Sequence, residues 1–427
     1  GAINNFLKRF FPAGFYYKTF MWPKSFWYKV YEPFIRKAAG LGVASLEKDK
    51  ERYEHKFEYC DLLVTGSGPS GLASAYAAAK NGAKVILAED KPRYGGTLLT
   101  DDVSIDNMSG KDWSEKIISE LKTMPNVTLK NRSQVFGYYD HNMMVMFERV
   151  GDHLSNKSKY TPRQRLWYIR AKETILSTGS IERPIVFGNN DTPGVVLSSA
   201  AKEYMKVYGV LVGRKPIIFT NNDSAYETAF EFKKNNVEPI ILDTREEHDS
   251  EVVQEAKNKG IQIKFSYGVI VANGYKKVKS AKIGKLTKDK KSFESTETIN
   301  CDCICVSGFW TPTVHLASQS GNKLKFDEKI DAFIPDKSKQ NEKTIGAANG
   351  SFTLQETIES GFKTGSELSS KITDKNNENK IPTVTEAKYS VHDKFWCMPL
   401  PKNENPKRFV DFQNDVAVSD IEIALRE

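Results

Sequence analysis

The sequence predicts an α/β protein built on two Rossmann-type strand-helix-strand units. The first unit begins at Tyr59, where an apolar strand leads into a glycine turn, an alanine-rich helix and a second strand that ends at Glu89. A second strand-helix-strand pattern covers residues 215–243. The chain has 427 residues, which predicts two or three packed units at roughly 100 to 200 residues per domain. These observations together indicate an α/β fold of more than one domain.

Composition and charge argue against a membrane span and against a nucleic-acid site. Hydrophobic residues make up 39% of the chain, and no apolar run approaches the roughly 20 residues that a membrane helix needs, so no membrane span is expected. The formal net charge is +8, but the lysines are dispersed. Their densest stretch, residues 276–291, alternates with apolar residues as an exposed hairpin would. A generally basic surface is therefore favoured over a nucleic-acid site.

The five cysteines are too few and too poorly spaced for a disulfide framework. Cys301, Cys303 and Cys305 alternate, so a strand would point all three thiols to one face. Buried core thiols are the favoured interpretation, and a metal cluster is the weaker alternative. Reduced thiols and the absence of a signal peptide predict a cytoplasmic protein.

Residues 1–58 predict an extended arm. Aromatic residues crowd positions 10–28, and Pro12, Pro23 and Pro33 interrupt the segment. Because each aromatic side chain buries about 150–250 Å² when it packs, we expect the arm to lie on a folded body, either its own or another subunit's.

The glycine turn of the first unit predicts one dinucleotide site. It reads Gly66-Ser67-Gly68-Pro69-Ser70-Gly71 between a strand and a helix. In such a fingerprint the first glycine allows the sharp turn, the second lets the backbone approach a pyrophosphate, and the third lets the helix and the strand pack closely. The pyrophosphate is then expected at the N-terminus of the helix.

The end of the second strand predicts which nucleotide binds. Glu89 or Asp90 is expected to accept hydrogen bonds from the adenosine ribose, and its charge disfavours the 2′-phosphate of NADP. NAD is therefore the predicted ligand. Lys91 and Arg93 leave a phosphate site open as an alternative, although two solvated side chains are the favoured interpretation.

The second unit is predicted to bind no dinucleotide. It has Thr220-Asn-Asn-Asp-Ser-Ala-Tyr226 where a glycine fingerprint would stand, and these side chains would block a pyrophosphate. Asp243 keeps the position of a ribose-binding acid, and we expect it to be a relic or a helix cap rather than a ligand.

Further motifs follow in the order Tyr94-Gly-Gly-Thr97, Glu173-Thr-Ile-Leu-Ser-Thr-Gly-Ser180 and Gly346-Ala-Ala-Asn-Gly350. Between residues 59 and 370 this order resembles the two-dinucleotide-binding-domain flavoprotein fold of the disulfide-reductase type. After the arm at 1–58, the resemblance implies a discontinuous NAD-binding domain at 59–194 and 300–370, and an inserted, degenerate nucleotide-binding-like domain at 195–299. Residues 371–427 are then expected to be a linker and the start of a truncated C-terminal domain.

Two departures from that family bear on the cofactor. Members that bind FAD place an aspartate where this sequence has Ala347, and they often carry a pair of redox cysteines that is absent near the expected flavin. The resemblance therefore implies NAD in the place of a flavin.

A more specific resemblance rests on longer motifs. They are Gly14-Phe-Tyr-Tyr-Lys-Thr-Phe-Met-Trp-Pro23, Tyr31-Glu-Pro33, Ala38-Ala-Gly-Leu-Gly42, Thr220-Asn-Asn-Asp-Ser-Ala225, Gly308-Phe-Trp-Thr-Pro312 and Phe409-Val-Asp-Phe-Gln-Asn-Asp415. With these motifs the chain resembles the alpha subunits of bacterial heterotetrameric sarcosine oxidases. In that family the alpha subunit holds NAD, while FAD and FMN in a partner subunit oxidise sarcosine to glycine, giving hydrogen peroxide and formaldehyde or methylenetetrahydrofolate.

The resemblance also implies partners and missing parts. The partners would be beta, gamma and delta subunits, and tetrahydrofolate would bind a C-terminal domain that starts after Glu427. A small N-terminal domain would precede Gly1. Two alternatives stay open: an NAD(P)H-dependent flavoprotein reductase, and a scaffold subunit in a related amine or amino-acid dehydrogenase complex.

The expected cofactor contacts come from the fingerprint and from the resemblance, and no catalytic residue or metal ligand is predicted. They are Gly66, Gly68, Pro69, Ser70, Gly71, Glu89, Asp90, Lys91, Gly96, Thr97, Val135, Thr178, Gly179, Ala347, Ala348 and Leu354.

Overall fold

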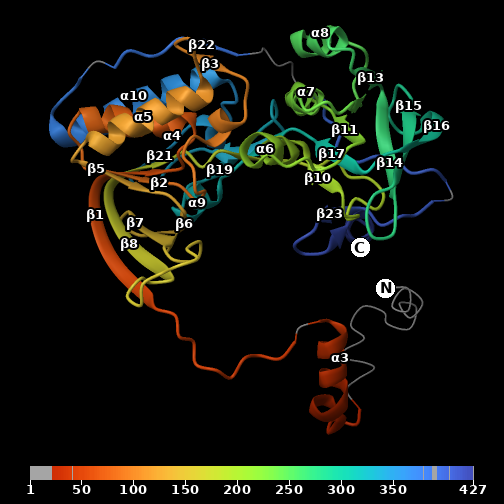
Figure 1. Cartoon of the computed structure of the whole chain (residues 1–427), viewed down its shortest axis with the longest axis horizontal. Coiled ribbons are helices and arrows are strands. Elements are labelled where there is room, and N and C mark those ends of the chain that lie inside the picture. The colour runs from red at the N-terminus through yellow and green to blue at the C-terminus, as the bar shows by residue number, and fades with distance from the viewer. Residues whose placement is uncertain (1–21, 41, 378, 387–391, 403, 427) are drawn as a thin grey trace. The chain divides into compact units, whose positions relative to one another are not determined.

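The computed structural model describes residues 22–40, 42–377, 379–386, 392–402 and 404–426. The chain divides into two compact units, Gly1–Glu51 and Arg52–Glu427 (Figure 1). Each unit is described by itself.

The described part of the first unit contains two short helices, η2 (Trp27–Tyr31) and α3 (Glu32–Ala38). The prediction of an extended arm is therefore wrong for these residues. Pro33 lies in the first turn of α3, where the missing N–H of a proline costs no helical hydrogen bond. Phe34 is 74% exposed within this structure, so the expectation that the arm packs on a folded body stays a prediction. The aromatic residues at 10–20 lie outside the described residues.

The first sheet lies in a part of the second unit that we call the first lobe. Its order is β5-β2-β1-β8-β7-β6, and β21 also pairs with β8. The bounds are β1 (Tyr53–Thr65), β2 (Val85–Ala88), β5 (Val127–Lys130), β6 (Ser133–Tyr139), β7 (Met143–Arg149), β8 (Gln164–Leu176) and β21 (Glu342–Thr344). β1 begins six residues before the predicted start at Tyr59, because its early residues pair with the long strand β8. The pairs β1–β2, β2–β5, β1–β8 and β8–β21 are parallel, so the carboxyl ends of these strands meet at one edge.

Three helices accompany the first sheet, namely α4 (Pro69–Lys80), α5 (Gly110–Thr123) and α10 (Leu354–Thr373) (Figure 1). They share one apolar core with β1 and β2. α4 and α10 pack closely, since a Cβ added at Gly361 would lie 2.5 Å from the Ser70 carbonyl oxygen. A separate core contains residues of β1, β7 and β8 together with the short helix α9 (His315–Gln319).

The second sheet defines the second lobe, and it confirms the second predicted strand-helix-strand unit. Its order is β10-β17-β11-β12-β13, and all its pairs are parallel. The strands are β10 (Val195–Leu197), β11 (Pro216–Thr220), β12 (Ile240–Asp243), β13 (Gln262–Phe265) and β17 (Cys303–Ser307). The helices are α6 (Ser198–Tyr208), α7 (Tyr226–Lys234) and α8 (Glu251–Asn258). An antiparallel sheet of β14 (Tyr267–Asn273), β15 (Ser280–Leu286) and β16 (Phe293–Asn300) contributes to a further core.

The position of β17 corrects one predicted boundary. The sequence predicts that the first domain resumes at residue 300, but β17 pairs with β10 and β11 inside the second sheet. Its backbone hydrogen bonds therefore hold the chain in the second lobe as far as Ser307.

The cysteine prediction needs a similar correction. Cys303 and Cys305 share one apolar core, whereas Cys301 precedes β17 and packs in another, so only two of the three thiols share a face. All three are buried, as the favoured interpretation required. Among the described residues no group of three or more histidine, cysteine or acidic side chains is arranged to hold a metal ion.

One buried lysine joins the two lobes. The Lys202 ammonium, on α6, lies 2.7 Å from the Asp101 carboxylate of the first lobe and 2.6 Å from the Glu227 carboxylate of α7. Its side chain is only 10% exposed, so the contact is shielded from solvent.

The predicted linker after residue 371 begins with described residues that pack on the first lobe. α10 runs to Thr373, and the chain then turns back through residues 375–377 and 379–386, which we call the strap. Within the strap, β22 (Val384–Thr385) pairs with β3 (Ser104–Ile105), which pairs with β4 (Met108–Ser109). The chain ends with the hairpin β23 (Phe409–Asp411) and β24 (Val416–Ala417) and the helix α11 (Val418–Ala424).

The remaining elements are short. They are η3 (Gly96–Leu99), η4 (Asp223–Ala225), η5 (Gly346–Asn349), and the strand pairs β9 (Ser180–Glu182) with β18 (Trp310–Pro312) and β19 (Leu324–Asp327) with β20 (Ala332–Pro335). A search of the described residues finds no helix with the length and apolar character needed to cross a membrane.

Candidate nucleotide-binding site

Two glycines of the fingerprint are required by the fold itself. Gly66 follows β1 with φ +96°, and a Cβ there would lie 2.3 Å from the Ser177 carbonyl oxygen at the end of β8. A Cβ at Gly71 would lie 1.9 Å from the Gly66 carbonyl oxygen. Both positions therefore exclude any larger residue, because the clashing atoms belong to the backbone.

Gly68, in contrast, is not required by the packing of the backbone. It is the N-cap of α4 with φ −65° and ψ −174°, a conformation that other residues adopt readily. A Cβ at this position would meet no atom within 4 Å, so the space in front of it is open. No side chain caps the α4 N-terminus, and a helix N-terminus facing open space suits an anion such as a pyrophosphate.

Glu89 is held at the end of β2 by three hydrogen bonds. Its Oε2 accepts from the Ser67 N–H at 2.9 Å and the Ser67 hydroxyl at 2.5 Å, and its Oε1 accepts from the Lys91 N–H at 2.9 Å. Burial, with a contribution from a hydrogen bond to Asp90, raises the pKa of Glu89 to about 7. The carboxylate that is expected to meet the ribose is thus fixed in place beside the glycine turn.

The two basic residues after Glu89 are turned toward the second lobe. The Lys91 ammonium lies 2.7 and 2.8 Å from the two carboxylate oxygens of Glu203 on α6, and an Arg93 guanidinium N–H donates to the Val207 carbonyl at 3.4 Å. Lys91 therefore has an acidic partner on α6, and its predicted contact with the nucleotide stays a prediction.

The loop after Arg93 lies against the fingerprint. A Cβ at Gly96, which has φ +55°, would lie 2.8 Å from the Gly68 Cα, so η3 begins directly beside the open space. Thr97 is exposed in η3. The double glycine is therefore needed for the close approach of two loops.

Residues after β8 and β21 complete the same edge. Gly179 has φ +70° and open space at its Cβ position, and the preceding Thr178 hydroxyl donates to the Thr313 carbonyl at 2.9 Å. In η5, a Cβ at Gly346 would lie 2.6 Å from the Ser70 hydroxyl oxygen. Ala347 is half-buried and Ala348 is fully buried beside it. Leu354 begins α10, close to the end of η5.

Val135 is placed less directly than the other predicted contacts. It lies in β6 with its side chain 8% exposed in an apolar core, so only its backbone is suited to face a ligand. The start of β6 does reach the site, because the Ser133 N–H donates to the Glu89 carbonyl at 2.7 Å.

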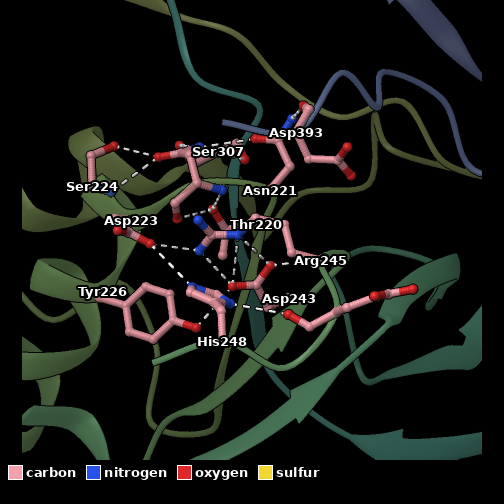
Figure 2. Close-up of polar contacts among 12 residues, drawn as sticks. Thr220, Asn221, Asp223, Ser224, Tyr226, Asp243, Arg245, His248, Ser307 and Asp393 are labelled. Atoms are coloured by element: carbon pink, nitrogen blue, oxygen red, sulfur yellow. Dashed lines mark hydrogen bonds and ion pairs between the residues drawn. The ribbon is translucent and has the colours of Figure 1, made fainter. Parts of the chain in front are cut away.

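The second sheet shows why a second dinucleotide has no room. Figure 2 shows a cluster of polar side chains at the carboxyl ends of β11, β12 and β17. The Arg245 guanidinium lies 2.7 Å from the Asp243 carboxylate and 2.7 Å from the Asp223 carboxylate, and both aspartate side chains are fully buried. The Tyr226 hydroxyl donates to Asp243 at 2.8 Å. Asp243 is thus neither a ligand nor a helix cap but the partner of a buried cation.

The asparagines of the degenerate fingerprint fill the rest of that space. The Asn222 amide donates to the Ser307 hydroxyl at 3.0 Å. The Asn221 amide donates to the Asp393 carbonyl at 2.8 Å (Figure 2). Sequence reasoning missed Arg245, although its place two residues after an acid at a strand end was a usable signal.

Comparison with known proteins supports the fold. A family model described as FAD dependent oxidoreductase matches residues 61–143. The sarcosine oxidase subunit alpha of Rhizobium meliloti (strain 1021) is 37% identical over 436 residues, covering 100% of this chain and 42% of the relative. The corresponding subunit of Corynebacterium sp. (strain P-1) is 32% identical over 90% of this chain and 40% of the relative. This chain is homologous to part of the sarcosine oxidase alpha subunit. It spans about two fifths of the length of these relatives.

Solved structures confirm the predicted fold. L-proline dehydrogenase from P. horikoshii has a TM-score of 0.60 at 18% identity, covering 90% of this chain and 69% of that chain. Thioredoxin reductase from T. acidophilum has a TM-score of 0.56 at 16% identity, covering 74% of this chain and 99% of that chain. The chain therefore has the two-dinucleotide-binding-domain flavoprotein fold of the disulfide-reductase type.

Proposed function

We propose that this chain is the NAD-binding part of a sarcosine oxidase alpha subunit. The complete complex would demethylate sarcosine to glycine with oxygen, giving hydrogen peroxide and formaldehyde or methylenetetrahydrofolate. The observation that carries the proposal is the open space in front of Gly68 at an uncapped helix N-terminus, in a chain related along its whole length to that subunit.

The residues around this space fit NAD. The open N-terminus of α4 suits a pyrophosphate, and the Glu89 carboxylate suits ribose hydroxyls while disfavouring a 2′-phosphate. Ala347 offers no carboxylate to a flavin ribityl chain. When bound, NAD supplies a nicotinamide ring that can exchange a hydride. The side chains of this site bind and orient the nucleotide, and we assign none of them a catalytic role.

The chemistry is proposed to take place on other subunits. FAD and FMN would be carried by a partner among the beta, gamma and delta subunits, and tetrahydrofolate by a further domain of the alpha subunit. We also propose a cytoplasmic location. Within this chain, the proposed NAD-binding domain keeps the sequence boundaries except that its second segment begins after Ser307.

The identity of the bound nucleotide tests the proposal. We would purify the 427-residue chain, denature it, and analyse the released small molecules by mass spectrometry. The expected result is NAD close to one per chain, without flavin. Stoichiometric FAD with a visible flavin spectrum would contradict the proposal.

A stand-alone NAD(P)H-dependent flavoprotein reductase is the second candidate, because the fold contains two nucleotide-binding-like lobes. Such an enzyme needs room for a second nucleotide, and the buried Arg245 network fills that place. Hydride transfer from NADH to a dye by the purified chain would favour this candidate.

A further inference from the structure

The strap returns along the first lobe from the end of α10 to its beginning. The Asn377 N–H donates to the Asn81 side chain at 2.9 Å near the end of α4, and nine residues later the chain reaches the first turn of α10. Figure 1 shows this blue segment passing along α10 to β22. Pairing of β22 with β3 and a hydrogen bond of 3.2 Å from the Val384 N–H to Gln355 hold the segment there.

The last residue of the strap, Glu386, caps α10. Its Oε2 accepts from the Leu354 N–H at 2.7 Å, and its Oε1 accepts from the Gln355 N–H at 3.2 Å. Both carboxylate oxygens therefore bind amides of the first turn of a 20-residue helix. The carboxylate comes from a residue more than 30 positions away, so its place depends on the strap and not on the local sequence.

Strand order places the capped helix end at the far end of the proposed nucleotide site from Glu89. The strands β2, β1, β8 and β21 are adjacent in this order, and their carboxyl ends share one edge. A nucleotide with its ribose at Glu89, beyond β2, and its pyrophosphate at Gly68, beyond β1, extends toward the ends of β8 and β21. η5 follows β21, lies against Ser70, and leads into α10.

Glu386 reverses the electrostatic character of this helix end. A helix N-terminus carries the equivalent of about +0.5 charge, so the Glu386 carboxylate alone shifts it to a net charge of about −0.5. Glu356 in the same turn is exposed, so solvent screens its charge. The nicotinamide ring of NAD⁺ is a cation, the ring of NADH is neutral, and a reduced flavin readily becomes an anion. The oxidised nicotinamide is the one of these three that gains from a negative charge.

We propose that Glu386 is a specificity-determining residue, which makes the first site prefer oxidised NAD⁺ over NADH and over a reduced flavin. The inference rests on the proposed NAD-binding function. It means that the bound nucleotide stays oxidised, because reduction removes its favourable interaction with the carboxylate.

Competition between the two redox forms tests this inference. The full chain is equilibrated with equal concentrations of NAD⁺ and NADH, and rapid gel filtration then removes the unbound nucleotide. The chain is denatured, and chromatography quantifies the NAD⁺ and the NADH that it releases. The variant is Glu386→Gln, which keeps the shape of the side chain and removes its charge. The matched control is Glu356→Gln, which removes the same charge from an exposed side chain in the first turn of α10.

The wild-type chain is expected to retain mainly NAD⁺. Glu386→Gln should lower the bound NAD⁺ to NADH ratio roughly tenfold, a typical effect of one full charge at a partly buried site, while Glu356→Gln leaves it within about twofold. If Glu386→Gln melts within a few degrees of the wild-type chain, the strap is still packed on α10. If its melting temperature falls further, the test passes to Glu386→Asp, which keeps the charge and must show the wild-type ratio of bound NAD⁺ to NADH.

The outcomes separate the two proposals. An unchanged ratio in Glu386→Gln, or the same fall in Glu356→Gln, would overturn the role of Glu386 and leave NAD binding intact. If the wild-type chain binds FAD and neither form of NAD, the proposed function fails and this inference fails with it.

Discussion

Replacement of Gly68 by alanine separates the role of the fingerprint in binding from its role in folding. A methyl group at this position would meet no atom of the chain within 4 Å, and the backbone conformation suits alanine. The loss of a flexible glycine from the unfolded chain should stabilise the fold by about 0.4–1 kcal/mol. The same methyl group would enter the space proposed for the pyrophosphate. Overpacking typically costs about 1–3 kcal/mol, which corresponds to roughly 5-fold to 150-fold weaker NAD binding.

Gly71→Ala is the matched comparison, because its Cβ would lie 1.9 Å from a backbone oxygen. We expect this variant to unfold at a clearly lower temperature, whereas Gly68→Ala should melt at or slightly above the wild-type temperature. Calorimetric titration with NAD and thermal unfolding followed by circular dichroism measure the two effects. Wild-type NAD affinity in Gly68→Ala would refute the assignment of this space to a ligand, and a strongly lowered melting temperature would refute the claim that the space is open.

Three further predictions follow from named contacts. Because burial raises the pKa of Glu89 to about 7 and ribose hydroxyls donate to its ionised form, NAD affinity should rise up to about tenfold per pH unit between pH 5 and 7 and level off above about pH 8. Glu89→Gln should flatten this profile, and a flat profile in the wild-type chain would contradict the assignment. Arg245→Met leaves Asp243 buried without its cation and should cost about 3–5 kcal/mol by urea unfolding, while Arg93→Met at the exposed surface should cost under about 1 kcal/mol. Lys202→Met removes the buried ion pairs between the lobes and should speed limited proteolysis between them. Cleavage at the wild-type rate would contradict this role of Lys202.

The sequence predicted the parts of the fold that depend on local pattern. The strand, glycine turn and helix from Tyr59 to Lys80 are visible because apolar periodicity changes at Gly66, and the second unit shows the same change near Thr220. The homology supports the resemblance to the sarcosine oxidase alpha subunit that the longer motifs suggested, and the solved structures confirm the fold.

Features that depend on distant pairing were not predictable in the same way. The first six residues of β1 are polar and aromatic, and they form a strand because β8 pairs with them from about 110 positions away. β17 joins the second sheet for a similar reason. Glu386 carries no motif of its own, and it acquires its partners, the Leu354 and Gln355 amides, only when the fold brings remote segments together.

The close contact between α4 and α10 has a consequence for synthesis of the chain. α4 ends at Lys80, and α10, which covers its small-residue face, ends at Thr373. At about 5–20 residues per second, the roughly 290 residues between these points take about 15–60 s to translate. During that time the alanine-rich face of α4 has no permanent cover, and the first lobe cannot complete its core. We therefore expect the nascent chain to need transient shielding, such as a chaperone provides, until α10 has been made.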